Sequence, residues 1–380
     1  MEKKKGLNFY LKEGWLNVEI LFKLMVTCVW LFVTGARNVG KTYGVLKWLL
    51  FGDKPCKKEN VDFNRCFPWG AKVFPFLWLR RTPAQYKSVA SNLFSKLLNR
   101  EGSDLILKEK QSGNTYSGIY ICERNEDGEL EINEDKLICY VSSVESLGKT
   151  NGLNMDDVNL IVIDEFIKTP SENNMSREFD RVMNILESIE RERVIEGKPA
   201  VRILGLSNAN ELANEYYNAL DCIDDAVNMA ESQQSYKQIA DFGLVLLFNS
   251  PISKMKAETP MYRNLAHGKS KYAQMAIDNK FKKNECELVK SRNLKDCKPI
   301  CSIDDVAFYS YYENGEAWVY VSNHKMGGKL FGESRAEHMR FIATNKWLYE
   351  VFLHSYMRFE NYTCMYRFHR IWDLKNWSDD

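Results

Sequence analysis

Four short apolar runs stand out in the first 210 positions, and each run ends in small or charged residues. Each has the length and the content of β-branched or aromatic residues typical of a strand that is buried on both faces. The runs are Val26–Thr34, Phe74–Leu79, Asn159–Ile163 and Val201–Leu206, and segments of helical spacing lie at Tyr43–Leu50, Pro83–Leu98 and Phe179–Arg193. Strands that alternate with helices in this way predict an α/β domain with a mainly parallel sheet.

The pattern changes in two other places. Gly118–Cys122 and Lys136–Val141 flank an acidic turn and predict a hairpin. After about Ile239 the character of the chain changes, and Asn249–Glu258 is polar. Beyond it we expect helices at Tyr262–Lys282 and Ser334–Arg358, and antiparallel strands at Glu287–Lys290, Val306–Tyr312 and Glu316–Ser322. We therefore predict an α/β domain at 1–245, a linker region at 246–283 and a smaller α+β domain at 284–380.

The composition fits a soluble globular protein, with 45% hydrophobic and 27% charged residues. A net charge of +1 excludes a global basic field, so any nucleic-acid-binding surface is a local patch. The ten cysteines form no CxxC pair and predict reduced thiols rather than a zinc site. The longest apolar run, Ile20–Val33, is shorter than the ~20 residues of a spanning helix. We expect a cytosolic protein with no membrane partner.

A glycine-containing motif follows the first predicted strand and precedes a helix. It matches the phosphate-loop pattern GxxxxGK[ST] at every fixed position. Glycines let successive N–H groups cradle phosphate oxygens, and the new helix adds its positive end. The lysine is expected to reach the β and γ phosphates, and the threonine hydroxyl to ligate Mg²⁺. We therefore predict that Gly35, Ala36, Arg37, Asn38, Val39, Gly40, Lys41 and Thr42 bind ATP with Mg²⁺.

Two later strands end in residues that complete such a site. Asp164 and Glu165 follow the third apolar run. We predict that Asp164 holds Mg²⁺ through a water molecule and that Glu165 acts as the general base toward the attacking water. An acidic pair at the start of a surface loop is the alternative. Ser207 and Asn208 end the fourth run and are candidates to sense the γ-phosphate, although a polar exit from a strand is also ordinary.

The order of several short sequence motifs along the chain is also informative. They are G-A-R-N-V-G-K-T, F-L-W-L-R-R at 76–81, I-V-I-D-E-F at 161–166, R-E-R-V at 191–194 and L-S-N-A at 206–209. This series resembles the DNA encapsidation ATPases of phi29-like tailed phages, which are related to large terminases and ring translocases. The resemblance covers about Phe32 to Ala209 and continues more loosely through I-D-N-K-F at 277–281.

The resemblance implies an ATP-driven motor that moves double-stranded DNA into a preformed capsid. It implies a ring of identical subunits, a pentamer, at the capsid portal in the host cytoplasm and absent from the mature virion. In such rings a basic residue of the next subunit completes each site. The candidates for this trans role are Arg191, Arg193 and Lys149, although the R-E-R-V word is offset from the family pattern and solvated surface charge is the alternative.

For the C-terminal domain the resemblance implies a degenerate RNase H-like fold. Asp304 and Asp305 are the carboxylates nearest to a two-metal nuclease pattern, but they lack convincing partners, so we expect no nuclease activity. Residues 358–377 interleave basic and aromatic side chains. That segment either binds the structural packaging RNA of the family or packs into the domain core. A regulatory ATP-binding switch and a cutting terminase remain the alternative functions.

Overall fold

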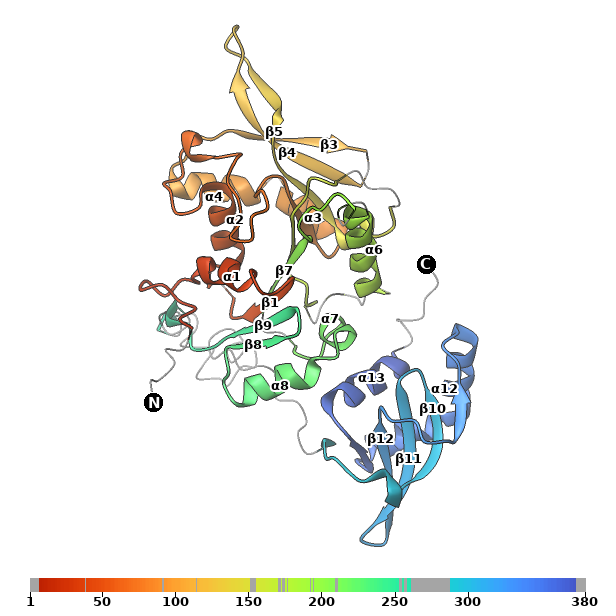
Figure 1. Cartoon of the computed structure of the whole chain (residues 1–380). Helices are drawn as coiled ribbons and strands as arrows, with labels where there is room; N and C mark the ends of the chain where they lie inside the picture. The colour runs from red at the N-terminus through yellow and green to blue at the C-terminus, as the bar shows by residue number, and fades with distance from the viewer. Residues whose placement is uncertain are drawn as a thin grey trace. The chain divides into compact units, whose positions relative to one another are not determined.

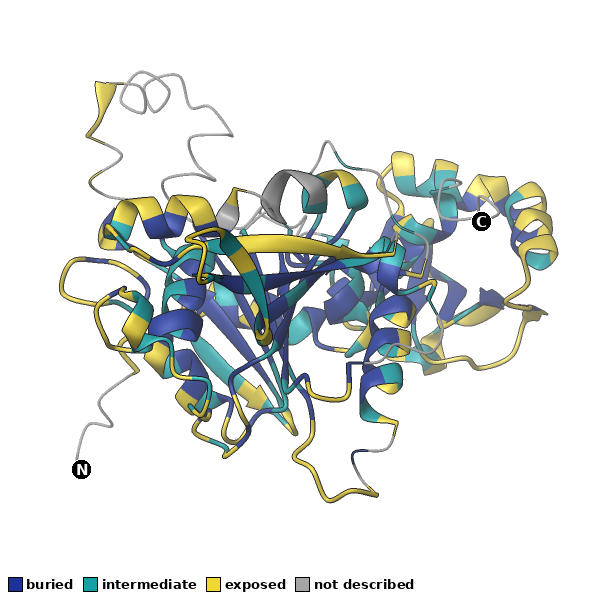
Figure 2. Cartoon of the chain, turned by 90° about the horizontal axis from the view of Figure 1, so that it is seen from above, coloured by how far each residue is buried: buried dark blue, intermediate teal, exposed yellow. Residues whose placement is uncertain are grey.

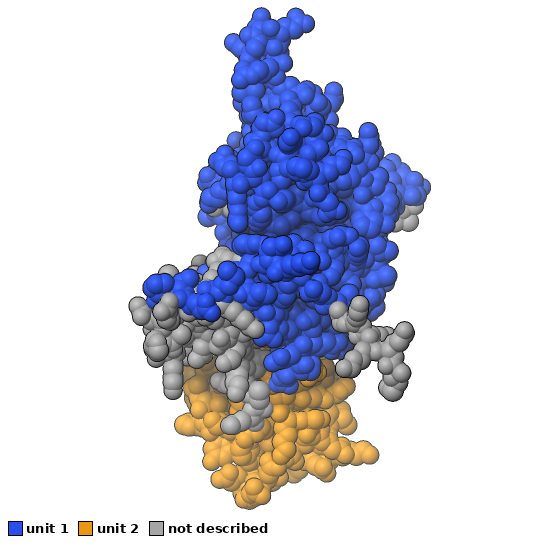
Figure 3. Space-filling model, turned by 90° about the vertical axis from the view of Figure 1, so that its left-hand side faces the viewer, with its two compact units in different colours: residues 1–171, 177–210, 229–280 blue, residues 172–176, 211–228, 281–380 orange. Residues whose placement is uncertain are grey.

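The computed structural model divides the chain into two compact units, which Figure 3 shows in two colours. The first unit comprises residues 1–171, 177–210 and 229–280, and the second comprises 172–176, 211–228 and 281–380. The structure describes residues 7–37, 39–90, 92–113, 115–150, 155–169, 172, 175, 177–191, 193, 195–208, 211–252, 255, 258–260 and 288–373.

A nine-stranded sheet forms the centre of the first unit. Its order is β3-β4-β5-β2-β6-β7-β1-β9-β8, and the six strands from β5 to β9 in that order pair in parallel. The outer pairs β3–β4, β4–β5 and β8–β9 are antiparallel. The strands are β1 (Trp30–Gly35), β2 (Phe76–Arg80), β3 (Leu107–Ser112), β4 (Tyr116–Arg124), β5 (Leu130–Ser143), β6 (Leu160–Asp164), β7 (Arg202–Asn208), β8 (Tyr236–Ile239) and β9 (Phe242–Leu247). The predicted mainly parallel α/β sheet is confirmed.

Helices cover both faces of this sheet (Figure 1). One face packs against α1 (Val18–Leu24), α2 (Lys41–Phe51) and α4 (Leu93–Glu101), which contribute to one core cluster with alternate strand residues. On the other face Phe32 of β1 meets Phe166, and α6 (Glu178–Glu190) buries an apolar stripe. The central strands β1, β2, β6, β7 and β9 are accordingly buried almost throughout, whereas the edge strand β3 is mostly exposed and the helices keep exposed outer sides (Figure 2). Burial on both faces explains why these strands are continuous apolar runs.

Two regions of the first unit depart from the simple alternation. The distal parts of β4 and β5 form a hairpin that extends beyond the rest of the sheet (Figure 1). The region predicted as one helix at Pro83–Leu98 contains α3 (Pro83–Ala90) and α4. This unit also contains the short elements η1 (Lys58–Asn60) and α5 (Val144–Leu147).

The second unit is built on a five-stranded sheet of order β13-β10-β11-β12-β14. The strands are β10 (Lys298–Ile303), β11 (Val306–Glu313), β12 (Glu316–Ser322), β13 (Lys329–Phe331) and β14 (Met357–Phe359). Its helical elements are α7 (Glu215–Ala219), the first part of α8 (Ile223–Glu231), η3 (Leu294–Asp296), α12 (Arg335–Leu353) and α13 (Tyr362–Trp372). The predicted hairpin between Val306 and Ser322 is confirmed.

The domain boundaries differ from the predicted ones. Residues 211–228 precede the predicted boundary at 245, yet they group with 281–380. The reason is a set of polar contacts to α13. Most of the predicted linker, including the helix expected at Tyr262–Lys282, lies outside the described residues.

Three local expectations also need comment. Residues 334–358 form α12 and then β14 rather than one helix, because Val319–Val321 of β12 pair with Met357–Phe359. The strand expected at Glu287–Lys290 is reduced to an isolated bridge at Val289. The described cysteines are free thiols, and no helix in the described ranges is long and apolar enough to span a membrane.

Candidate functional site

Three neighbouring parallel strands end at one edge of the large sheet. Strand β7 pairs with both β1 and β6, so the ends of these three strands lie side by side. Gly35 ends β1, Asp164 ends β6 and Asn208 ends β7. In open α/β sheets, ligands bind outside the carboxyl ends of the strands. The residues predicted from separate motifs are therefore brought together at this edge.

The phosphate loop closes tightly around its lysine. Gly40 precedes α2 with φ +87°, a left-handed conformation that favours glycine. A Cβ atom at Gly35 would lie 2.6 Å from Leu247 Cβ, so a larger residue does not fit there. The buried Lys41 Nζ donates to the carbonyls of Gly35 at 3.0 Å and Ala36 at 2.7 Å. Arg37 is exposed, and Asn38 lies outside the described residues.

Asp164 links the loop to the neighbouring strands. The Thr42 hydroxyl donates to Asp164 Oδ1 at 2.9 Å, and Arg80 Nη2 lies 2.9 Å from Asp164 Oδ2. Burial raises the pKa of the Asp164 carboxyl, while the charge of Arg80 and the bond from Thr42 act in the opposite direction. Arg80 Nη1 lies 2.6 Å from Glu165 Oε2, so one guanidinium spans both predicted carboxylates.

Arg80 is not among the site residues predicted from the sequence, yet its ion pairs place it inside the candidate site. It ends β2, which pairs with β6, the strand that ends in Asp164. The missing signal was the adjacency of β2 and β6, which are separated by β3, β4 and β5 along the chain.

Backbone geometry fixes the turn after β6. Glu165 adopts φ +65°, and its N–H donates to Leu206 O at 2.7 Å. The buried Ser207 hydroxyl accepts from Ile167 N–H at 3.2 Å, so it holds this turn. Asn208 Oδ1 accepts from Lys41 Nζ at 3.4 Å. Of the two predicted sensor residues, Asn208 contacts the phosphate-loop lysine, and Ser207 supports the segment after Glu165.

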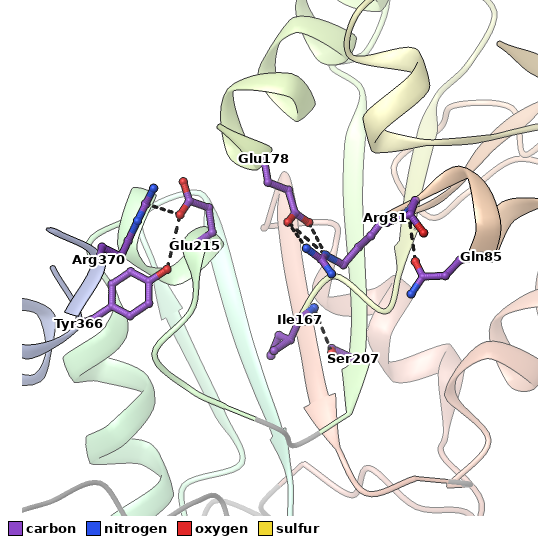
Figure 4. A network of polar contacts seen from close by, with 9 residues as sticks. Arg81, Gln85, Ile167, Glu178, Ser207, Glu215, Tyr366 and Arg370 are labelled. Atoms are coloured by element: carbon purple, nitrogen blue, oxygen red, sulfur yellow. Dashed lines mark hydrogen bonds and ion pairs between the residues drawn. The ribbon is translucent and has the colours of Figure 1, made fainter. Parts of the chain in front are cut away.

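A buried ion pair anchors α6 beside the site (Figure 4). Arg81 Nε lies 2.9 Å from Glu178 Oε1, and Arg81 Nη2 lies 2.7 Å from Glu178 Oε2. Only 1% and 6% of these side chains are exposed. The pair joins the residue after β2 to the first residue of α6. The Thr82 N–H donates to Gln85 at 3.2 Å next to it.

The three candidates for a trans role have different surroundings. Arg193 is 2% exposed and donates to the carbonyls of Asp156 and Val158 at 2.8 and 3.1 Å. Its burial lowers the pKa of its guanidinium, and its bonds hold the loops that lead into β6 and β7. Arg191, at the end of α6, and Lys149, after α5, are exposed. Of the two arginines, Arg193 is therefore buried and Arg191 is exposed.

The second unit places its predicted carboxylates in other interactions. Asp304 Oδ1 lies 2.9 Å from Nε2 of the buried His338, and Asp305 lies 3.8 Å from Lys325 Nζ. Among the described residues, no group of three His, Cys, Asp or Glu side chains could hold a metal ion. The Asp304–Asp305 pair therefore has other partners here.

The aromatic and basic C-terminal segment packs within its own unit. Phe368 contacts Phe308 and Phe359, and it is fully buried. Arg370 and Tyr366 contact Glu215 of α7 (Figure 4). These contacts favour the packing interpretation for α13. Lys375 and Trp377 lie outside the described residues.

A mainly parallel sheet with a GxxxxGK[ST] loop between strand and helix, and carboxylates at a neighbouring strand end, is the architecture of P-loop α/β proteins. Within that class the chain belongs to the podovirus DNA encapsidation protein (Gp16) family, whose model matches residues 123–371. The matched region includes β6 and β7 and begins after the phosphate loop.

Solved structures of similar fold cover nearly the whole chain. The Phi-28 gp11 DNA packaging motor aligns with a TM-score of 0.62 and 16% identity over 97% of this chain and 99% of that chain. The bacteriophage Phi-29 viral genome packaging motor assembly aligns with a TM-score of 0.57 and 20% identity over 95% and 99%. At these identities the likeness shows a shared fold. No curated protein matches the chain in sequence.

Proposed function

We propose that this protein is an ATP-driven motor that moves double-stranded viral DNA into a preformed capsid. The observation that carries the proposal is the 2.9 Å contact between Thr42 Oγ1 and Asp164 Oδ1. It unites the phosphate loop with the acidic end of β6, which is the pairing that P-loop hydrolases use for Mg²⁺. Membership of a DNA encapsidation family supports movement of the DNA into the capsid.

The described residues fit ATP with Mg²⁺. The Lys41 ammonium donates to two carbonyls of the loop. The oxygens of a phosphate bound in this loop are charged and would accept stronger hydrogen bonds from it. Thr42 and Asp164 provide two neighbouring oxygen ligands of the kind that Mg²⁺ prefers. Bound Mg²⁺ would neutralise charge on the phosphates. A positive ion would also favour the ionised form of Asp164, whose burial otherwise disfavours it.

We propose that Glu165 activates the attacking water. It follows Asp164 directly, its side chain is 38% exposed, and its carboxylate is held by Arg80. A carboxylate at this point can orient a water molecule and accept its proton. One of its oxygens, Oε2, lies 2.6 Å from Arg80 Nη1. We propose that Asn208 reports the presence of the γ-phosphate through its contact with Lys41.

We propose further that the protein acts as a ring of identical subunits, a pentamer, at the capsid portal in the host cytoplasm. Arg191 and Lys149 are exposed and could each enter the site of a neighbour, where a positive charge stabilises the transferring phosphoryl group. The solved relatives are described as packaging motors, one of them as a motor assembly. Double-stranded DNA and the capsid portal are the partners that we propose for this role, and a structural RNA is a further partner that the family resemblance implies.

For the second unit we propose a degenerate RNase H-like domain without nuclease activity. Three antiparallel strands, β10 to β12, are flanked by two strands that pair in parallel. Asp304 contacts His338, and two-metal catalysis needs a set of free carboxylates. A cutting terminase is therefore the less favoured function. Plasmid cleavage with Mn²⁺ that Asp304→Asn abolishes would overturn this part of the proposal.

The test of the main proposal is the rate of ATP hydrolysis with and without double-stranded DNA. We expect DNA to stimulate the wild-type protein. Glu165→Gln should retain ATP binding and lose hydrolysis by roughly 10²- to 10⁴-fold. Glu134→Gln, at a side chain that is 70% exposed, is the matched control and should behave as wild type. A hydrolysis rate that neither DNA nor Glu165→Gln changes would favour the regulatory switch.

A further inference from the structure

The segment before α1 packs directly on the phosphate loop. The Leu16 N–H donates to Val39 O at 3.0 Å. The indole of Trp15 lies against Gly40, where an added Cβ atom would be 3.1 Å from Trp15 Cε3. An aromatic ring therefore touches the loop immediately before Lys41. None of the phosphate-binding chemistry described above uses this ring.

Trp15 belongs to a small aromatic and cationic group. Its side chain stays 37% exposed although it lies beside a buried core. The exposed Arg100 of α4 holds its guanidinium carbon 5.4 Å from the Trp15 ring and 4.8 Å from the Tyr43 ring. The Tyr43 hydroxyl is fixed by Glu101, which also accepts from Lys47 at 2.7 Å. Three chain segments thus present rings and a cation beside the start of α2.

The direction of a bound nucleotide follows from the same helix turn. Lys41 points toward Asn208, and Thr42 points toward Asp164, so these side chains mark the γ-phosphate and metal end. Gly40 and Tyr43 are three residues apart and share one face of the first turn. Because the N–H groups of that turn hold the inner phosphates, the nucleoside leaves the loop beside the side chain that follows Thr42.

We propose that Trp15, together with Arg100, forms the stacking surface for the base of the nucleoside triphosphate. An indole face and a guanidinium plane both stack on purine rings. Neither side chain forms a hydrogen bond to the described residues of the phosphate loop. Trp15 is then a binding residue whose contribution is confined to the base. This inference rests on the proposed nucleotide site and deepens it.

The experiment compares two ligands on the full-length protein by calorimetry. ATP carries a base, and inorganic tripolyphosphate presents the phosphate chain alone. Trp15→Leu should weaken ATP binding by roughly 10- to 100-fold and leave tripolyphosphate binding unchanged. Trp15→Phe should keep most of the ATP affinity because a ring remains. Trp347→Leu, at a tryptophan of the second unit that is 41% exposed, should change neither affinity.

A second variant separates stacking from loop support. Arg100→Gln leaves the contact between Trp15 and Gly40 in place and removes only the cation. We expect a smaller loss that is again confined to ATP. Equal losses for ATP and tripolyphosphate in both variants would show that the group only supports the loop, and unchanged ATP affinity in both would also overturn the proposal. A wild-type protein that binds neither ligand would instead refute the nucleotide site itself.

Discussion

The buried pair of Arg81 and Glu178 offers a quantitative test of how the site is held. The pair joins the carboxyl end of β2 to the start of α6, and its side chains are 1% and 6% exposed. The three nitrogen–oxygen contacts measure 2.9, 3.1 and 2.7 Å, so each carboxylate oxygen receives a charged donor. Removing one partner leaves the other charge buried without its main counter-charge.

We expect Arg81→Leu and Glu178→Leu each to lower the free energy of unfolding by about 3–5 kcal/mol, the usual cost of an uncompensated buried charge. The double variant should lose much less than the sum, because an apolar pair of similar volume buries no charge. Urea unfolding of the full chain, followed by far-ultraviolet circular dichroism, measures all three. The exposed pair Lys110 and Glu134 is the control, and Lys110→Ala should leave the unfolding midpoint unchanged.

Additive losses in the double variant would refute this reasoning, since they would mean that the two side chains act through unrelated contacts. Single losses below about 1 kcal/mol would also refute it, because that is the range of a solvated pair. Small single losses would show that the start of α6 is held by its apolar stripe rather than by charge.

Three other variants test separate features. Thr42→Val should leave ATP affinity in EDTA unchanged and remove most of the gain that Mg²⁺ provides, because the hydroxyl beside Asp164 is lost; calorimetry with and without Mg²⁺ measures this. Gly205→Ala should destabilise by about 1–3 kcal/mol in urea unfolding, since its Cβ would lie 2.5 Å from Phe32 Cδ1. Asp224→Ala should cost about 1–2 kcal/mol and speed amide exchange at the start of α13, because Asp224 accepts from Tyr362 N–H at 2.8 Å and from the Thr363 hydroxyl at 2.7 Å.

Hydrophobic patterning predicted the central strands well, for a physical reason. Strands β1, β2, β6 and β7 are buried on both faces, so each is a continuous apolar run with a sharp polar end. The phosphate-loop glycines and lysine also follow from local requirements of backbone and charge. Strand β10 was missed because its pattern mixes exposed and buried positions over only six residues.

Hydrophobic patterning does not predict which distant elements of the chain lie side by side in the fold. The contact of Arg80 with Asp164 depends on β2 lying beside β6, which no local signal encodes. The assignment of residues 211–228 to the second unit depends on contacts such as Asp224 with Thr363, which are 139 positions apart. Arg193 was proposed from its position in a short sequence motif. Only the structure shows that its guanidinium is buried and bonded to backbone carbonyls.

The placement of residues 211–228 changes how mechanical load would pass through the chain. The second unit is joined to the first near residues 210 and 228, as well as through the segment before residue 288. A pulling force between the units is therefore shared by several peptide connections. One of them continues directly from Asn208, whose amide touches the phosphate-loop lysine. This connection therefore begins two residues after a group that contacts Lys41.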